Sequence, residues 1–386
     1  MAKQQRHIAI LGSVGVPAHY GGFETLAEQL ARHHAAHARP ERLSITCSAP
    51  GCVSKPRRFL GADLRYLPLP ANGAASVPYD ILSLLRARAS GADVALLLGV
   101  SGALALPFLA GRGMRVVAHV DGQEWRRAKW SRAARQFLRQ SEAIAVRHAD
   151  AVIADSPAIA DDLWRRYGRR ADVLSYGGDQ GLDHTTVALP DWAPKDYALA
   201  ICRVEPENNI HMLLEAATAT DKPLICVGNW EKSRYGRALR SRYASHPKLW
   251  LRNPIYDPGP LQALRRNASL YLHGHSAGGT NPSLVEMMHV GKPVFAFDCI
   301  FNRQTTQGAA RYFSDADDLA RLWRQEAEPD MGRALRDLAR THYRWDDIGA
   351  RYFDLFERVS QAPRQARTLK PSSETAPCRT FFLRRS

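Results

Sequence analysis

The sequence predicts an α/β protein made of two doubly wound domains that face each other across a cleft. Short apolar stretches suited to buried strands alternate with stretches of helical periodicity along most of the chain. The alternation forms two series, separated by the polar, proline-containing segment 179–196. A chain of 386 residues also exceeds what one hydrophobic core usually organises. Because ligands of such folds bind beyond the carboxyl ends of the strands, we expect the functional site in the cleft.

The elements follow in order along the chain. In the first series we expect strands at 7–12, 43–49, 64–70, 93–100, 114–122, 150–156 and 171–179, and helices at 21–37 and about 131–148. In the second we expect strands at 197–203, 222–229, 249–255, 269–276 and 292–298, and a helix from Pro282 to just before Gly291. The predicted domains are 1–182 and 195–345, followed by a helix at 346–360 that returns to the first domain and a basic tail at 361–386, expected to be disordered.

The composition is that of an ordinary globular protein with an excess of positive charge. Hydrophobic residues make up 45% of the chain, and 53 Lys and Arg against 38 Asp and Glu give a net charge of +15. This excess favours an anionic partner, such as a phosphorylated substrate, an anionic lipid surface or a nucleic acid, although solvated helix faces explain it equally well. The scattered cysteines indicate neither zinc nor disulfides, so we expect a reducing cytoplasm.

Targeting and membrane signals are weak. The first residues lack the pattern of a signal peptide. The stretch 94–111 carries no charge, but Gly99, Gly102 and Pro107 interrupt it. We therefore expect a strand, a turn and a helix there rather than a membrane span.

The segment 278–298 combines a glycine pair, a polar triplet and a glutamate on an otherwise apolar helix. A glycine-rich turn before a helix directs backbone N–H groups and the positive end of the helix dipole outward, which suits a phosphate. The candidate binding residues of this turn are Gly279, Thr280, Asn281 and Ser283. We expect Glu286, one turn into the helix, to accept hydrogen bonds from sugar hydroxyls.

A second motif of this domain, CRVEPENNIHMLLEA at 202–216, ends a strand at Arg203. A guanidinium at that place suits a diphosphate because it donates to two oxygens at once. A salt bridge to Glu205 or Glu207 is the alternative.

In the first domain, Gly21 and Gly22 precede a helix and allow backbone N–H groups to approach a diphosphate or a sugar. With Glu24 they are the candidate binding residues of this stretch. The glycines before them do not form G-x-G-x-x-G, so a nicotinamide-binding turn is not supported. The alternative is a structural loop with Glu24 as a carboxylate of the first helical turn.

The stretch HVDGQEWRRAKW at 119–130 places polar and aromatic residues directly after a strand. Its polar candidates are Asp121, Glu124, Arg127 and Lys129. The carboxylates suit sugar hydroxyls and the cations suit a phosphate. Trp125 and Trp130 suit either stacking on a sugar ring or half-buried packing.

None of these stretches carries a Ser/His/Asp set, a P-loop or the D-x-D pair of metal-dependent sugar-nucleotide enzymes. His273 and His275 fall on one face of an expected strand but lack a third ligand nearby, so we assign no metal site. We expect no metal and no cofactor, with arginine and the helix dipole neutralising a leaving diphosphate.

Taken together, these residues resemble GT-B glycosyltransferases of family 4, specifically the bacterial rhamnosyltransferase-like branch with a DUF1972-type N-terminal domain. The resemblance rests on GVPAHYGGFET, VDGQEWRRAKWS and DAVIADS…YGGD in the first domain, and on RVEPENN and HGHSAGGTNPSLVEMM in the second. It spans about residues 7–360 in order. It implies two Rossmann-like domains and a nucleotide-sugar donor as co-substrate.

Family members usually carry a Glu-x7-Glu motif whose second Glu binds the nucleotide ribose. Glu286 matches that position, and Gly278 replaces the first Glu. They also carry an Arg and a Lys on the diphosphate; Arg203 matches the Arg, and Asn208 stands at the Lys position as a candidate nucleotide contact. Both departures are typical of the rhamnosyltransferase-like branch. By resemblance the anomeric configuration is retained without a side-chain base, and the departing phosphate oxygen takes the acceptor's proton.

The resemblance implies a metal-independent, retaining glycosyltransferase of surface polysaccharide synthesis, with Asp121, Glu124 and Arg203 as catalytic candidates. We expect L-rhamnose to move from dTDP-L-rhamnose onto a lipid-diphosphate-linked saccharide; a UDP- or GDP-sugar is the alternative donor. The protein is expected in the cytoplasm, peripheral on the inner face of the plasma membrane, with the basic stretch 126–139 on anionic lipid.

Two other classes stay open, a non-hydrolysing nucleotide-sugar epimerase and a basic nucleic-acid-binding protein. No nucleic-acid-binding motif is present, so we expect no nucleic-acid partner. The sequence makes no prediction of the oligomeric state.

Overall fold

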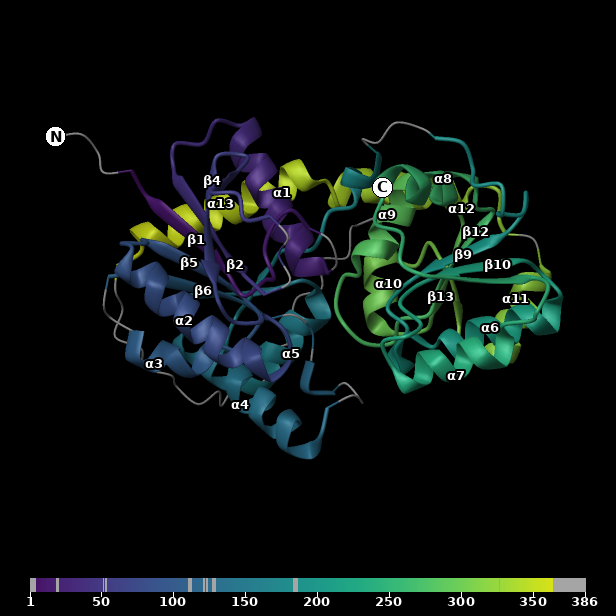
Figure 1. The fold of residues 1–386 in the computed structure, drawn as a ribbon, viewed down its shortest axis with the longest axis horizontal. Coiled ribbons are helices and arrows are strands. Elements are labelled where there is room, and N and C mark those ends of the chain that lie inside the picture. The colour runs from purple at the N-terminus through teal and green to yellow at the C-terminus, as the bar shows by residue number, and fades with distance from the viewer. Residues whose placement is uncertain are drawn as a thin grey trace, which may run out of the picture.

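The chain folds into two α/β domains that lie side by side, each a parallel sheet with helices on its faces (Figure 1). The computed structural model describes residues 5–18, 21–50, 52, 54–109, 113–120, 122, 124–126, 130–182, 187–325 and 327–363. The predicted fold class, two doubly wound Rossmann-like domains, is confirmed.

The N-terminal sheet has the strand order β3-β4-β2-β1-β5-β6-β7-β8. Its strands are β1 (His7–Leu11), β2 (Arg42–Ser48), β3 (Arg58–Phe59), β4 (Ala62–Leu67), β5 (Val94–Leu98), β6 (Arg115–Val120), β7 (Ala151–Ala154) and β8 (Asp172–Val173). Its helices are α1 (Gly22–Ala36), α2 (Ser76–Ala89), α3 (Leu106–Leu109), α4 (Arg132–His148) and α5 (Pro157–Tyr167). The strands pair in parallel, except that β3 runs antiparallel to β4. The order reverses between β1 and β5, and such a switch point is where doubly wound sheets bind ligands.

The C-terminal sheet has the parallel order β11-β10-β9-β12-β13-β14. Its strands are β9 (Ala198–Ile201), β10 (Leu224–Val227), β11 (Leu249–Arg252), β12 (Leu270–His273), β13 (Val294–Phe297) and β14 (Arg311–Phe313). Its helices are α6 (Ile210–Thr220), α7 (Arg234–Tyr243), α8 (Pro258–Asn267), α9 (Pro282–Val290), α10 (Ile300–Thr306), α11 (Ala316–Arg324) and α12 (Met331–His342). The switch point of this sheet lies between β9 and β12.

The last described helix, α13 (Trp345–Gln361), belongs to the N-terminal core although it follows the C-terminal domain in sequence. It runs beside α1 (Figure 1, yellow and purple). Its aromatic side chains Tyr352, Phe353 and Phe356 are fully buried in that core. The chain therefore crosses between the domains after β8 and returns just before α13.

The predicted strands are found with one clear difference. The expected strand 171–179 contributes only Asp172 and Val173 to the sheet, because the chain then turns toward the other domain, where Gly178 N donates to Tyr343 O. The described part of the stretch 94–111, residues 94–109, forms β5, a turn and a short helix, as predicted. Among the described residues, no helix has both the length and the apolar character needed to cross a bilayer.

Candidate functional site

A cleft of about 1280 Å³ separates the domains and is lined by both. Its walls come from loops that follow the carboxyl ends of strands, including Gly12 after β1, Gly99 after β5 and Arg203 after β9. The position agrees with the rule for open α/β sheets. Residues of all four predicted motif stretches line this cleft.

The glycine-rich turn 277–281 presents a row of backbone donors to the cleft. All five residues line it, and none of their N–H groups donates a hydrogen bond to any described residue. Consecutive unpaired amides of this kind form an anion-binding concavity. Backbone donors are therefore open at the turn where we expect a phosphate.

These donors lie in the turn before helix α9 and include three of the four predicted residues, Gly279, Thr280 and Asn281, but not Ser283. Pro282 has no N–H, Ser283 N donates to Asn281 Oδ1 at 3.0 Å, and Leu284 N donates to Asn281 O at 3.1 Å. The first turn of α9 thus satisfies its own amides. What remains for an anion is the preceding turn together with the helix dipole.

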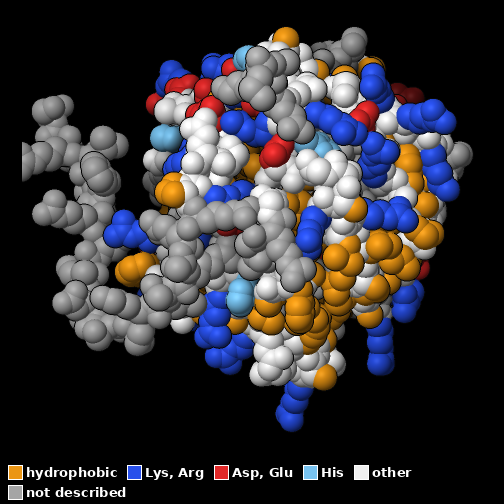
Figure 2. Space-filling view, turned by 90° about the vertical axis from the view of Figure 1, so that its left-hand side faces the viewer, with side chains coloured by type: hydrophobic (Ala, Val, Ile, Leu, Met, Phe, Trp, Pro, Cys, Tyr) orange, Lys and Arg blue, Asp and Glu red, His pale blue; other side chains and the backbone are white. Residues whose placement is uncertain are grey.

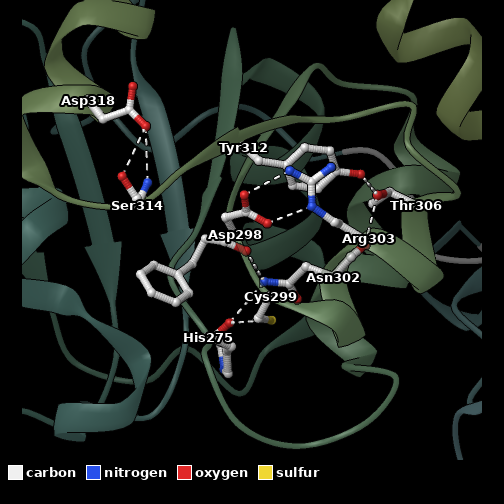
Figure 3. A network of polar contacts seen from close by, with 10 residues as sticks. His275, Asp298, Cys299, Asn302, Arg303, Thr306, Tyr312, Ser314 and Asp318 are labelled. Atoms are coloured by element: carbon white, nitrogen blue, oxygen red, sulfur yellow. Dashed lines mark hydrogen bonds and ion pairs between the residues drawn. The ribbon is translucent and has the colours of Figure 1, made fainter. Parts of the chain in front are cut away.

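The start of the turn is fixed from two directions. His275 O accepts hydrogen bonds from Asn302 Nδ2 at 2.9 Å and from Cys299 Sγ at 3.7 Å (Figure 3). Ser276 donates through both its backbone N and its hydroxyl to Glu207 O, at 2.9 and 2.8 Å. Anchoring of this kind preorganises the open amides that follow.

The tip of the turn touches the opposite domain. Thr280 is buried, and its hydroxyl donates to Asp155 O at 2.7 Å. A Cβ added at Gly279 would lie only 1.7 Å from Asp155 Oδ1. Gly279 therefore allows the two domains to approach, and the Thr280 side chain serves this contact instead of facing a ligand.

The side chains of Asn281 and Ser283 also serve the local structure. The Ser283 hydroxyl donates to Asn281 Oδ1 at 2.8 Å and accepts from Tyr271 OH at 2.9 Å. Asn281 is the N-cap of α9. Both residues line the cleft, but the Ser283 hydroxyl and Asn281 Oδ1 are already paired.

Glu286 projects from α9 to the cleft, and its carboxylate is held on both oxygens. Gln180 Nε2 donates to Oε1 at 2.6 Å, and the Arg265 guanidinium donates to Oε2. The Glu286 side chain is 14% exposed, which leaves room for a further donor. Since each carboxylate oxygen accepts more than one hydrogen bond, ribose hydroxyls remain compatible with this geometry.

Gln180 connects Glu286 to the interdomain crossing. Its Oε1 accepts from Trp345 Nε1 at 2.6 Å, and Trp345 N donates to Asp179 Oδ1 at 2.8 Å. The outgoing and returning segments are thus tied together beside the carboxylate. No local pattern indicates this connection, because Gln180 and Glu286 are 106 residues apart.

Arg203 lines the cleft and has no ion-pair partner among the described residues, so the predicted alternative of a salt bridge to Glu205 or Glu207 is not formed. Asn208, the candidate nucleotide contact, also lines the cleft. It is buried, and its Nδ2 donates to Arg203 O at 2.7 Å, so its amide shapes the loop that carries the arginine. A cation that we did not predict, Lys232 in the loop after β10, lines the same cleft.

On the N-terminal side, Gly21 and Gly22 line the cleft at the start of α1. Gly21 has φ +129°, and the Glu24 carboxylate covers it so closely that a Cβ would lie 2.1 Å from Oε2. Glu24 Oε1 accepts from Val14 N at 2.9 Å. Burial raises the pKa of Glu24, while the hydrogen bond from Val14 and the positive charge of Arg203 across the cleft act against this rise. Glu24 thus orders the loop between β1 and α1.

The stretch 119–130 is only partly described. Asp121, Arg127 and Lys129 lie outside the described residues. Glu124 lines the cleft and accepts from Trp130 Nε1 at 3.1 Å. Trp125 donates to Glu142 Oε2 at 3.2 Å, which matches the packing alternative for this indole.

Two cleft residues escaped the sequence analysis. Asp80 on α2 is 3% exposed, its Oδ1 has no hydrogen-bond partner, and burial raises its pKa to about 8. Tyr256, between β11 and α8, lines the opposite side and is 60% exposed. The sequence does not mark either residue as functional, because Asp80 lies within a helical pattern and Tyr256 lies in a loop without a motif.

Among the described residues, His273 and His275 belong to no group of three potential metal ligands. The two rings stack with centroids 4.3 Å apart, although β12 ends at His273. Burial lowers the pKa of His273 to about 3. The five described cysteines are free.

Two Rossmann-like domains that enclose a cleft at the carboxyl ends of their strands define the GT-B architecture. Solved structures are similar to this chain over nearly its whole length. Sucrose-phosphate synthase from Thermosynechococcus elongatus is similar with a TM-score of 0.75 and 17% identity, covering 92% of this chain and 99% of that one. The catalytic domain of starch synthase IV from Arabidopsis thaliana, bound to ADP and acarbose, has a TM-score of 0.67 and 12% identity over 93% and 100%. A glycosyltransferase from Rickettsia africae has a TM-score of 0.67 and 12% identity over 94% and 100%.

Sequence comparison is less informative. Residues 5–179 match the family model DUF1972, a domain of unknown function. No curated protein matches the sequence.

Proposed function

We propose that the protein is a glycosyltransferase that takes a sugar from a nucleotide-diphosphate donor bound in the cleft. The observation that carries this proposal is the row of unpaired N–H groups at 277–281, which shares one cleft with Arg203 and Glu286. Amides and a guanidinium suit a diphosphate, and a carboxylate suits sugar hydroxyls. The GT-B architecture is that of several solved glycosyltransferases.

In the donor complex, Arg203 and the turn amides bind the diphosphate and Glu286 binds the ribose. Gln180 and Arg265 hold the Glu286 carboxylate in one orientation, so that it does not have to be ordered when the donor binds. Lys232 supplies the positive charge that the family pattern would place at Asn208. Tyr256 offers an exposed ring for the nucleobase.

The reaction we propose retains the anomeric configuration. The bond between the anomeric carbon and the diphosphate breaks, negative charge develops on the departing oxygen, and that oxygen takes the proton of the attacking acceptor hydroxyl. Arg203 and the amides of 277–281 stabilise this charge without a metal ion. From the N-terminal side, Asp121 and Glu124 bind hydroxyls of donor sugar and acceptor.

The preferred donor in this proposal is dTDP-L-rhamnose, and the acceptor is a lipid-diphosphate-linked saccharide. The preference rests on the resemblance of the motifs to rhamnosyltransferase-like enzymes; a UDP- or GDP-sugar is the alternative.

We place the acceptor's lipid against the N-terminal domain, which would make the protein peripheral on an anionic membrane. Leu85 on α2 is 47% exposed, Phe108 on α3 is 76% exposed, and both helices pack against the turn 103–105. Hydrophobic and basic side chains gather on this side of the molecule (Figure 2). Each Lys or Arg near such a surface contributes about 1 kcal/mol.

Arg203→Ala and Glu286→Gln test the site. Each variant should stay folded and lose donor binding and turnover by about 100-fold, since it removes a charged contact to the diphosphate or the ribose. The glutamine keeps a partner for Arg265, which a shorter side chain would leave buried and unpaired. The measurement is thermal shift against dTDP-, UDP- and GDP-sugars, followed by transfer to a lipid-linked acceptor.

Wild-type binding in both variants would contradict the site. Interconversion of a nucleotide sugar without any acceptor would identify the epimerase instead, and salt-dependent binding of DNA or RNA without donor binding would identify a nucleic-acid-binding protein.

A further inference from the structure

Three side chains that commonly bind metal ions meet where α1 packs against the start of α13. His33 is in the last turn of α1, His37 is the C-cap residue that directly follows this helix, and Asp346 is in the first turn of α13. Asp346 Oδ1 lies 3.3 Å from His33 Nδ1 and 2.6 Å from His37 Nε2. One ligand atom from each residue falls within 4.8 Å of the others.

We propose that His33, His37 and Asp346 bind a divalent transition-metal ion, for which Zn²⁺ is the best fit. Zn²⁺ holds imidazole nitrogens and carboxylate oxygens about 2.0–2.2 Å from the metal, which places tetrahedral ligand atoms about 3.4 Å apart. The separation of His33 and Asp346 already matches this value. His37 and Asp346 are 48% and 55% exposed, so their contact can open by the small amount required and water can fill the remaining position.

His33 is preorganised for this role. Its ring is buried against α13 at Gly349, where a Cβ would lie 2.5 Å from His33 Cγ. Its Nδ1 forms no hydrogen bond, although it faces Asp346. Burial, followed by the nearby His37 and Arg39, lowers the pKa of His33, which favours the neutral imidazole that a metal ion needs.

The surrounding charges set limits on the affinity and on the choice of ion. Arg39 and Arg344 lie close enough to act on His33 and Asp346, respectively, and both oppose a cation. The carboxylate of Asp346 compensates for one of them. Two imidazoles and one carboxylate suit Zn²⁺, whereas Mg²⁺ and Ca²⁺ prefer sets of oxygen ligands.

The site is separate from the cleft, since none of its three residues lines it. It is therefore independent of the proposed function and of the metal-free transfer reaction. A bound ion would fasten the start of α13 to α1, next to Trp345, which hydrogen-bonds to Gln180. Its role would be to stabilise the returning segment on the N-terminal domain.

The test uses the full chain without a histidine tag, stripped of metal with a chelator. Calorimetric titration should show one Zn²⁺ per chain, Co²⁺ should give the visible spectrum of a site with nitrogen ligands, and Zn²⁺ but not Mg²⁺ should raise Tm. His37→Ala and Asp346→Ala should weaken Zn²⁺ binding by at least about 10- to 100-fold, the usual cost of losing even an outer-shell partner. Both positions are exposed, so the variants should fold.

His342→Ala removes an exposed histidine of α12 and serves as the matched control, with unchanged binding expected. Zn²⁺ binding that persists in His37→Ala and Asp346→Ala would mean that other histidines or cysteines bind the ion. Absence of Zn²⁺ binding to the wild-type chain would leave only the hydrogen bond between His37 and Asp346, with His33 beside it. Either result overturns the proposal.

Discussion

The two glycine-rich loops that face each other across the cleft use their backbone donors in opposite ways. In the turn 277–281, no N–H group has a partner among the described residues. In the loop between β1 and α1, Val14 N donates to Glu24 at 2.9 Å and Ala18 N donates to Glu28 at 2.6 Å. One loop keeps its amides open, and the other pairs the amides of Val14 and Ala18 with carboxylates of its own helix.

The difference in free amides suggests that the two sides of the cleft bind different groups, an anion on one side and neutral or positive groups on the other. The open turn shares its side with Arg203 and attracts negative charge. The N-terminal side carries Glu24 and Asp80, whose carboxyls are buried and have raised pKa values. Glycine content alone therefore does not identify a phosphate site; the acidic residues that follow the loop decide whether its amides are available.

Of the variants proposed here, Gly279→Ala should disturb the open turn most and cause the largest loss of turnover. The added Cβ would collide with Asp155, so the turn and the opposite domain must move apart. A displacement near 1 Å typically costs about 100-fold in rate, and we expect at least that loss in turnover. Steady-state kinetics with circular dichroism would measure the loss and verify the fold.

Gly278→Ala is the matched control. Its φ of +117° makes alanine strained, but no atom lies within 4 Å of the added Cβ. It should cost roughly 1–2 kcal/mol of stability and keep the domain contact. Equal losses of turnover in both variants would show that turn conformation, and not domain approach, is what Gly279 provides.

The sequence predicted the turn and its surroundings from local patterns. Apolar runs located the strands, and Pro282 and Gly291 gave the bounds of α9. The open amides include those of the predicted Gly279, Thr280 and Asn281 but not that of Ser283, because its capping by Asn281 depends on side-chain geometry. The contact of Thr280 with Asp155 joins residues 125 apart, and the buried state of Asn208 depends on packing. Periodicity carries no information about such long-range contacts.

Asp80→Asn tests whether the buried carboxyl on the N-terminal side of the cleft is protonated in the folded protein. Because the pKa of Asp80 is raised to about 8, the folded protein keeps a proton that the unfolded chain loses near pH 4. Wild-type stability therefore falls as pH rises between these values, by up to about 1.4 kcal/mol per unit, and levels off above pH 8. Asparagine has no proton to lose, so the variant should gain stability relative to wild type from pH 5 to pH 8.

Thermal unfolding at pH 5 and pH 8 measures this difference. Asp191→Asn, at an exposed position, should follow the wild type at both values. A constant difference between Asp80→Asn and wild type would mean that Asp80 is ionised in the folded protein.

Gln180→Ala should have the smallest effect on turnover. It tests whether the interdomain crossing orients the Glu286 carboxylate. The variant loses the donor to Glu286 and the acceptor for Trp345, while Arg265 still holds the carboxylate. One hydrogen bond contributes about 1 kcal/mol, so KM for the donor should rise about fivefold with kcat nearly unchanged. Gln304→Ala is the matched control, because it removes an interdomain hydrogen bond to Ala158 N without touching Glu286. If both variants raise KM equally, domain approach accounts for the effect; if only Gln180→Ala does so, the orientation of Glu286 accounts for it.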